Sequence, residues 1–327
     1  TEGPTSGGTE VIITGTGFLG WYPMTVSFGG IQAFFTVDST TQITAVAPWH
    51  DAGDVLVSVT AIGGSSNEVT FTYLPPPAVT SVSPAAGPLA GGTSVTINGA
   101  GFTGATAVSF GGTAATSFTV VSDTQITATV PAHAAGAAQV VVTAVNGSSS
   151  DVVDFTYLVV PTVTSVSPSK GPAAGGMWGT IHGPNFAAST AVSIGGAAAP
   201  AALINYDKTQ ITAVTPAHAA GAAQVVVTTA GGSSTEAVNF TYVAAPVVVS
   251  VSPAAGPIGG GTVIITGTGF TGATSVRFIP LNITSFTVDS DTQITAELPG
   301  SAAGYYNVEV TTPDGGKSNT DVVFSYE

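Results

Sequence analysis

The chain has 327 residues, of which 44% are hydrophobic and only 7% are charged, with 42 glycines, 21 prolines and no cysteine. Its formal net charge of −14 leaves no basic surface for nucleic acid or for anionic membranes, so neither is expected as a partner. Without cysteine there is no disulfide, thiolate nucleophile or cysteine-based zinc site, and no apolar run approaches the roughly 20 residues of a membrane span.

The chain is built from four copies of one unit. Phenylalanine recurs at the same place in each copy, with a constant interval of 84 residues, at Phe18, Phe102, Phe186 and Phe270. Gln-Ile-Thr and Phe-x-Tyr return with nearly the same period, which excludes chance similarity. The predicted domains are residues 1–74, 75–158, 159–243 and 244–327.

Within each unit the apolar pattern has period two. Val153, Phe155 and Tyr157 share one face, while Asp154 and Thr156 share the other. This alternation indicates strands with one buried face, and Gly-rich turns every 8–12 residues are typical of a β-sandwich. Three short linkers containing proline predict a semi-rigid, elongated rod of all-β domains.

The repeats resemble the IPT/TIG family of immunoglobulin-like domains. The motifs that carry the resemblance are Ser-Val-Ser-Pro followed by Gly-Pro-x-x-Gly-Gly at 165–176 and 250–260, Ile-x-Gly-x-Gly-Phe at 97–102 and 265–270, and Asp-Thr-Gln-Ile-Thr at 123–127. The resemblance implies four tandem immunoglobulin-like sandwiches. The low charge is similar to that of bacterial surface, secreted or phage virion members, which implies an extracellular, cell-surface or virion location.

The sequence offers little chemistry. His133 and His218 occupy one repeated turn position, with His50 close to it in the first unit and Ser301 in the fourth. A histidine repeated on successive turns indicates turn structure, and one per unit falls short of the ligand cluster of a zinc site. We expect no catalytic residue, no cofactor and no metal, and therefore no enzyme.

The first unit differs from its siblings by aromatic residues in loops. It inserts two residues around Trp21 and Tyr22, and it carries Trp49 beside His50. Exposed loop aromatics serve sugar stacking and protein contacts, although these two tryptophans could instead pack on each other or on an upstream segment. Thr1 aligns with Ala85, so the opening strand is missing. We expect either a longer polypeptide or a strand donated by a neighbour.

The third unit replaces a small polar strand with Met-Trp-Gly-Thr-Ile-His. Alternation places Trp178 and His182 on the outer face, while Gly179 takes the core position of Val95. Either Trp178 is an exposed anchor, or a local slip turns it inward to fill the space at Gly179. An exposed anchor is favoured, because a slip would turn every side chain of the strand to the opposite face.

Further differences lie on the outer faces. Val141 and Val226 are predicted to point outward in the middle units, and the fourth unit offers Tyr305 and Tyr306 where others have alanines. Outward apolar groups with low surface charge favour lateral packing. The leading hypothesis is a structural or adhesive stalk that binds other protein subunits, through self-association or a longer assembly. The alternative is a carbohydrate-binding accessory region of a secreted glycosidase, with a polysaccharide as partner.

Overall fold

The computed structural model describes residues 1–18, 23–186, 191–200, 202–205 and 207–327. The two predicted residues Trp21 and Tyr22 lie outside this part. The chain forms two compact units, Thr1–Val159 and Val160–Glu327, and each contains two β-sandwich domains. All regular elements of the described residues are strands, as the period-two pattern predicts, and none of them forms a helix that could span a membrane.

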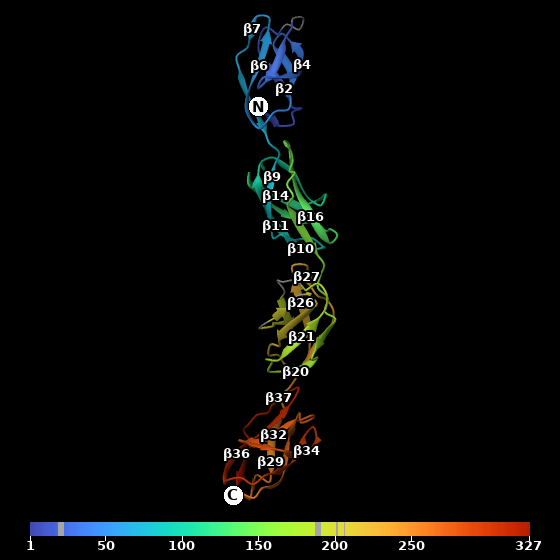
Figure 1. The fold of residues 1–327 in the computed structure, drawn as a ribbon, viewed down its shortest axis with the longest axis vertical. Coiled ribbons are helices and arrows are strands. Elements are labelled where there is room, and N and C mark those ends of the chain that lie inside the picture. The colour runs from blue at the N-terminus through green and yellow to red at the C-terminus, as the bar shows by residue number, and fades with distance from the viewer. Residues whose placement is uncertain (19–22, 187–190, 201, 206) are drawn as a thin grey trace. The chain divides into compact units, whose positions relative to one another are not determined.

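The second domain shows the complete pattern (Figure 1). Its strands are β9 (Ala78–Ser83), β10 (Ala86–Pro88), β11 (Ser94–Ala100), β12 (Ala105–Phe110), β13 (Thr113–Ala114), β14 (Ser117–Ser122), β15 (Gln125–Thr129), β16 (Gly136–Ala144), β17 (Gly147–Ser148) and β18 (Asp154–Leu158). A small sheet has the order β14-β15-β11-β9. A large sheet has the order β10-β18-β16-β12-β13, with β17 paired to β16.

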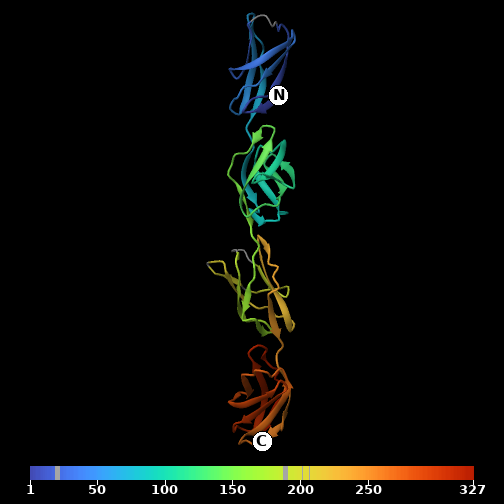
Figure 2. The ribbon, with the colours of Figure 1, turned by 90° about the vertical axis from the view of Figure 1, so that its right-hand side faces the viewer.

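The third and fourth domains repeat these two sheets, and Figure 2 shows the layers within each domain. The third contains β19 (Ser165–Ser167), β20 (Lys170–Pro172), β21 (Trp178–His182), β22 (Ala191–Ile194), β23 (Ala197–Ala198), β24 (Ala202–Ile204), β25 (Gln210–Val214), β26 (Gly221–Thr229), β27 (Gly232–Ser233) and β28 (Asn239–Val243). The fourth contains β29 (Val247–Ser252), β30 (Ala255–Gly256), β31 (Gly261–Thr268), β32 (Ser275–Ile279), β33 (Leu281–Ile283), β34 (Ser285–Ser290), β35 (Gln293–Leu298), β36 (Gly304–Thr312), β37 (Gly316–Lys317) and β38 (Val323–Tyr326).

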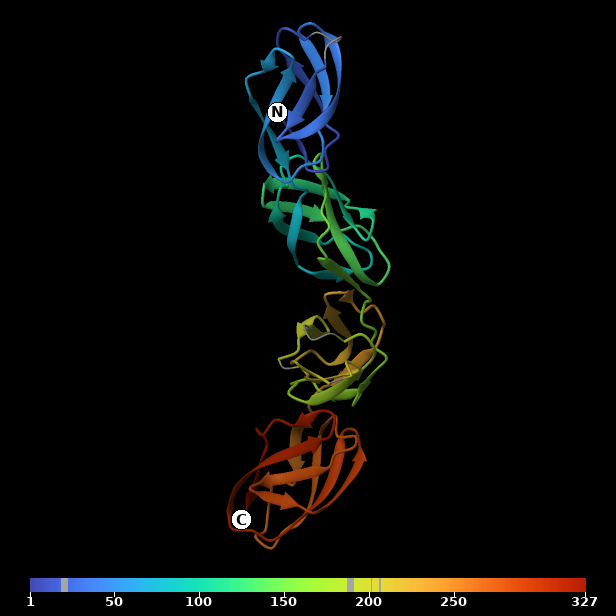
Figure 3. The same ribbon diagram turned by 45° about the horizontal axis from the view of Figure 1, so that its top comes forward.

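In the described residues of the first domain no strand corresponds to β9, since this sequence begins at the position of Ala85. Its strands, which lie at the blue end of Figure 3, are β1 (Glu2–Pro4), β2 (Glu10–Thr14), β3 (Thr25–Phe28), β4 (Ile31–Ser39), β5 (Gln42–Val46), β6 (Gly53–Ala61), β7 (Gly64–Ser65) and β8 (Val69–Leu74). The long strand β4 pairs with β3 through its first half and with β5 through its second half. This double pairing joins the two sheets into one strand order, β1-β8-β6-β3-β4-β5-β2, in which β2 is the counterpart of β11.

Each domain buries its own apolar core between its sheets. The residues that alternation places inward, such as Ile97, Phe110 and Phe155, are fully buried. The glycine of the Gly-x-Gly-Phe motif has positive φ, 73° at Gly101, and Asn185 takes the same position in the third domain with φ 65°. Glycine and asparagine tolerate this left-handed conformation best, so the motif shapes a turn and is not a phosphate-binding loop.

Candidate functional site: outer sheet faces

The repeated histidines form part of the domain structure. In the first three domains an imidazole stacks on the tyrosine of the Phe-x-Tyr motif, with ring centroids 4.9 Å apart for His133 and Tyr157. The Nδ1 atom of His133 lies 2.9 Å from the carbonyl oxygen of Ala134. Burial raises the pKa of the Tyr157 hydroxyl, which donates to the Pro131 carbonyl at 2.8 Å. The histidine therefore packs on the core tyrosine and contacts the backbone of its own turn, a structural role that its repetition predicts.

Tyr306 takes the place of this histidine in the fourth domain, so its expected role as a surface residue is not what the structure shows. Its ring packs edge-on against Tyr326 at 5.0 Å, and its hydroxyl lies 2.8 Å from Ser301 Oγ and 3.0 Å from the Ala302 carbonyl oxygen. Its neighbour Tyr305 is 82% exposed. Adjacent residues of a strand point to opposite faces, so only one of the two tyrosines can face outward.

The aspartates of the Asp-Thr-Gln-Ile-Thr turn also have structural partners. The Asp291 carboxylate accepts hydrogen bonds from Thr271 Oγ1 at 2.7 Å and from the backbone N–H groups of Gly269 and Thr271. These bonds, with that of the Thr271 hydroxyl largest, hold the pKa of Asp291 below its ordinary value. In the second domain Asp123 accepts the corresponding bonds from Thr103 and Gly101, and these bonds, with that of the Thr103 hydroxyl largest, lower its pKa. Within the described ranges, no group of three or more His, Asp or Glu side chains is arranged to hold a metal ion.

The remaining predicted surface residues fall into two groups. Trp49 and Trp178 are well exposed, at 66% and 53%. His182, Val141 and Val226 are half-buried. The partner of Val141 across the large sheet is Ser109, and that of Val226 is Ser193. At the equivalent place in the fourth domain, Glu309 is buried beneath Lys317 and Arg277, with Nζ of Lys317 3.3 Å from Glu309 Oε1.

Strand β21 settles the orientation of Trp178. Trp178 pairs with Val214, Gly179 with Ala213 and Ile181 with Ile211, with no register shift along the pair. The same register holds between β11 and β15 in the second domain. The alternative of a local slip is therefore wrong, and Trp178 lies on the outer face of the small sheet.

Trp178 belongs to an apolar patch on this outer face. Its cross-strand neighbour is Val214, and the 65% exposed Leu203 of β24 pairs with Thr212, diagonal to Val214. Side chains opposite and diagonal to one another on one sheet face are close enough to interact. We call Trp178, Val214 and Leu203 the third-domain patch.

A second patch lies at the corresponding place in the first domain. Phe34 is 89% exposed and pairs across β4 and β5 with Val46, while Ile12 of β2 is 63% exposed and lies diagonal to Val46. Sequence reasoning missed Phe34, although the comparison of copies contains the signal, because Ser117 occupies its register position in the second domain. We call Ile12, Phe34 and Val46 the first-domain patch.

The second and fourth domains carry polar groups at this place. Thr129 stands where the patches have valine, and its Oγ1 accepts a 3.0 Å hydrogen bond from Ser117 Oγ. In the fourth domain Glu297 takes this position and accepts a 2.7 Å hydrogen bond from Thr262 Oγ1. At this pair of positions the first and third domains carry valine beside an exposed large apolar side chain, whereas the second and fourth carry hydrogen-bonded polar groups. The contrast concerns these positions and not the whole face, since Glu10 lies opposite Val46 in the first domain and Ile264 is 40% exposed in the fourth.

These sandwiches, with their repeated turns and cores, define a protein of tandem immunoglobulin-like domains. The IPT/TIG domain family matches residues 1–73, 77–157, 161–242 and 246–326, so the chain belongs to this family. It is 29% identical over 223 residues to human fibrocystin-L, covering 64% of this chain and 5% of that protein. This chain thus spans a small fraction of the relatives it matches.

Two solved structures are similar to this chain over most of its length. The extracellular region of plexin A4 aligns with 99% of this chain and 37% of its own, at 16% identity and a TM-score of 0.37. FdeC, described as an Escherichia coli adhesin, aligns with 77% of this chain and 96% of its own, at 16% identity and a TM-score of 0.31.

Proposed function

We propose that the chain is a non-enzymatic structural or adhesive module of a cell surface, filament or virion that binds other protein subunits through its outer sheet faces. The observation that carries this proposal is the exposure of Trp178 in the third-domain patch. A tryptophan presents up to about 250 Å² of surface, and its exposed fraction is 53%. Burying that area of about 130 Å² would contribute roughly 3 kcal/mol to an interface.

The first-domain patch supports the same proposal. Phe34 exposes more of its ring than Trp178, and its cross-strand neighbour Val46 is 37% exposed. Aromatic anchors surrounded by smaller apolar groups are typical of residues that dominate binding energy. The chain has only 4 basic and 18 acidic residues, and one of the acidic residues, Glu10, lies opposite Val46 in the first-domain patch. No charged residue pairs with Trp178 or Leu203 in the third-domain patch.

Analytical ultracentrifugation over a range of protein concentrations tests the proposal. The wild-type chain is expected to self-associate, and Trp178→Ser is expected to weaken association by about tenfold to a hundredfold, corresponding to roughly 1.5–3 kcal/mol. The matched control is Val152→Ser, which changes a side chain that is 84% exposed but belongs to neither patch. A wild-type chain that stays monomeric at high concentration would contradict self-association, and equal effects of the two substitutions would contradict the role of the patch.

The exposed Trp49 favours a second candidate function, carbohydrate binding by the loops of the first domain. Its indole is 66% exposed on the loop between β5 and β6, where a sugar ring could stack on it. A polysaccharide pull-down compares the wild type with Trp49→Ala and Trp21→Ala. Loss of polysaccharide binding in these variants supports carbohydrate binding by these loops. Binding that is unchanged in the variants, or absent from the wild type, contradicts it.

A further inference from the structure

The outer face of the large sheet in the fourth domain carries a cluster of charged side chains. Glu309 on β36 is 6% exposed and pairs across the sheet with Arg277 on β32. Lys317 on β37 also contacts it, with Nζ 3.3 Å from Glu309 Oε1. Two cations share one carboxylate, so the cluster has a net positive charge. Arg277 and Lys317 are half of the 4 basic residues in this chain.

The Arg277 guanidinium has donors that no described residue uses. Its Nε atom is buried and has no hydrogen-bond partner in the part of the chain that the structure describes. Its Nη1 atom lies 3.7 Å from Glu309 Oε1, which is too far for a hydrogen bond. A planar guanidinium presents its N–H groups in a fork that fits a carboxylate. The Arg277 side chain is 33% exposed, so a carboxylate from another molecule can reach it.

The large sheet folds without this cluster in the other domains. The residue at the register position of Arg277 is serine in each of them, and in the second domain Ser109 pairs there with Val141. Moving a carboxylate and a guanidinium out of water costs free energy that their mutual attraction often only balances. Stability of the domain therefore does not explain the cluster, whereas a negatively charged ligand accounts for it.

Apolar side chains lie beside the cluster on the same face. Ile279 follows Arg277 by two residues on β32 and is half-buried. Its cross-strand partner Asn307 pairs on the other side with Val323, which is 39% exposed. Tyr305, which is 82% exposed, lies diagonal to Val323. The face therefore offers a guanidinium with an apolar surface next to it.

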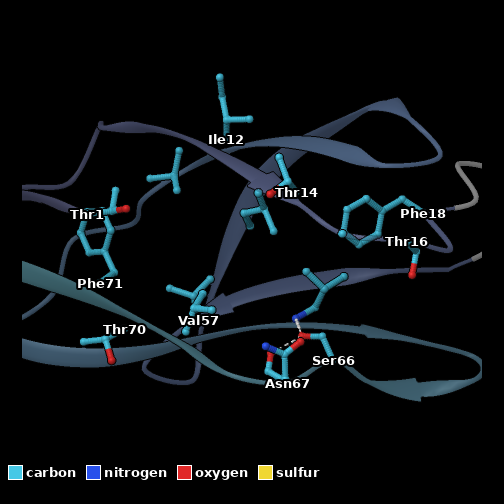
Figure 4. Close-up of a pocket in the computed structure, with 15 residues that line it drawn as sticks. Thr1, Ile12, Thr14, Thr16, Phe18, Val57, Ser66, Asn67, Thr70 and Phe71 are labelled. Atoms are coloured by element: carbon cyan, nitrogen blue, oxygen red, sulfur yellow. Dashed lines mark hydrogen bonds between the residues drawn. The ribbon is translucent and has the colours of Figure 1, made fainter.

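The first domain carries the opposite charge on the corresponding face. Residues 1–74 contain no basic residue, and their acidic residues are Glu2, Glu10, Asp38, Asp51, Asp54 and Glu68. Glu2 of β1 and Asp54 of β6 both pair with Thr72 of β8, so these side chains form a row on one face of the large sheet. Val57 of β6 points to the interior of the domain (Figure 4), so Asp54 and the 50% exposed Leu56, at alternate positions of β6, point outward.

The charged groups of the two faces match in spacing. Neighbouring strands lie about 4.8 Å apart, so Glu2 and Asp54, which are two strands apart, are separated by about 10 Å. Arg277 and Lys317 are also two strands apart, because β32 and β37 pair with Thr311 from opposite sides. Two carboxylates on one face therefore stand at the same interval as two cations on the other.

We propose that this face of the fourth domain binds the outer face of the large sheet in the first domain of a second copy. Leu56 lies one two-residue step, about 6.8 Å, beyond Asp54 on its strand. The same step separates Ile279 from Arg277. With β6 antiparallel to β36, three contacts form together: Asp54 with Arg277, Glu2 with Lys317, and Leu56 with Ile279. This inference rests on the proposed function and identifies its partner as a second copy. Because two different faces meet, the contact builds open chains of copies.

Sedimentation velocity over a range of protein concentrations tests the contact, with Trp178→Ser in every chain so that the third-domain patch contributes little. Arg277→Ser and Asp54→Ala each introduce the residue that the second domain has at that position, so folding is retained. Each is expected to weaken association by about tenfold or more, because it removes one partner of an interfacial ion pair. An equimolar mixture of the two variants should associate again but stop at a 1:1 pair, since each chain keeps one intact face.

Lys208→Asn and Glu68→Gln are the matched controls, because each removes one charge outside the two faces and should leave association unchanged. Association that survives Arg277→Ser, that the controls weaken equally, or that the mixture does not restore would overturn the proposal. So would binding of polygalacturonate that Arg277→Ser abolishes in a chain that stays monomeric, since that result assigns the face to an acidic polysaccharide. The proposed function fails by a different result, an effect of Trp178→Ser no larger than that of Val152→Ser, so the two failures are distinguishable.

Discussion

Replacement of Gly179 by alanine should stabilise the third domain. Gly179 is a buried glycine within β21, at the core position that Val95 and Val263 occupy elsewhere, and a Cβ atom there would meet only the Ser167 carbonyl oxygen, at 3.7 Å. A glycine inside a strand costs about 0.5–1 kcal/mol relative to alanine through chain entropy. Burial of one methyl group contributes about 0.8 kcal/mol more. The expected gain in the free energy of unfolding is therefore about 1–2 kcal/mol.

The chain supplies its own reporter for this measurement. It has 3 tryptophans, and replacing Trp21 and Trp49 by phenylalanine leaves Trp178 as a fluorescence probe of the third domain alone. Urea unfolding followed at this tryptophan should move to higher denaturant in Gly179→Ala with an unchanged slope. The matched control is Gly183→Ala, which should destabilise the domain because its Cβ atom would overlap the Thr162 carbonyl. If Gly179→Ala is neutral or destabilising, the space at this position is not available and the reasoning is refuted.

Three further predictions concern the turns. Hydrogen bonds lower the pKa of Asp291 in the folded chain, so the stability that they contribute is present above its unfolded pKa of about 4 and is lost as pH falls through the folded value. In Asp291→Asn the melting temperature should therefore fall less than in the wild type between about pH 6 and pH 2. Gly111→Ala should speed hydrogen exchange in β12, because Gly111 has φ +56° and an added Cβ atom would lie 2.7 Å from His133 Nε2. Adding His133→Ser to this variant removes the overlap and should restore part of the protection. Tyr306→Phe removes a hydroxyl with two partners and should lower the stability of the fourth domain by about 1 kcal/mol, measured by denaturant unfolding, whereas Tyr305→Phe should have no effect.

The all-β fold could be predicted because four copies carry the same alternation, so chance apolar residues in one copy do not obscure the pattern. The orientation of Trp178 followed from the same rule, and the register of β21 confirms it. The rod expected from the linker prolines stays a prediction. Tyr306 was misjudged although alternation gives the answer, since Val308 faces the core and residues two apart in a strand share a face.

The residue that fixes the first strand of each sandwich could not be predicted from the sequence. Asp151 in the second domain and Asn319 in the fourth each accept a hydrogen bond from the backbone N–H of a valine in that strand, at 2.8 Å. Asp151 stands two residues after Ser149, whereas Asn319 follows Ser318 directly. Two different chain positions thus reach the same point in space, which only side-chain distances reveal. Gly99 is likewise a common turn residue in sequence and acquires meaning from the Ala78 carbonyl that approaches it.

The apolar patches cannot be explained by the stability of the domains that carry them. A side chain as exposed as Phe34 buries little surface on folding, so its hydrophobic contribution to the folded state is small. The sibling residue Ser117 shows that the same strand pair forms with a polar side chain there. Folding of the domain therefore does not require an aromatic ring at this position, and burial of Phe34 against another subunit would give it the stabilising contact that it lacks within its own domain.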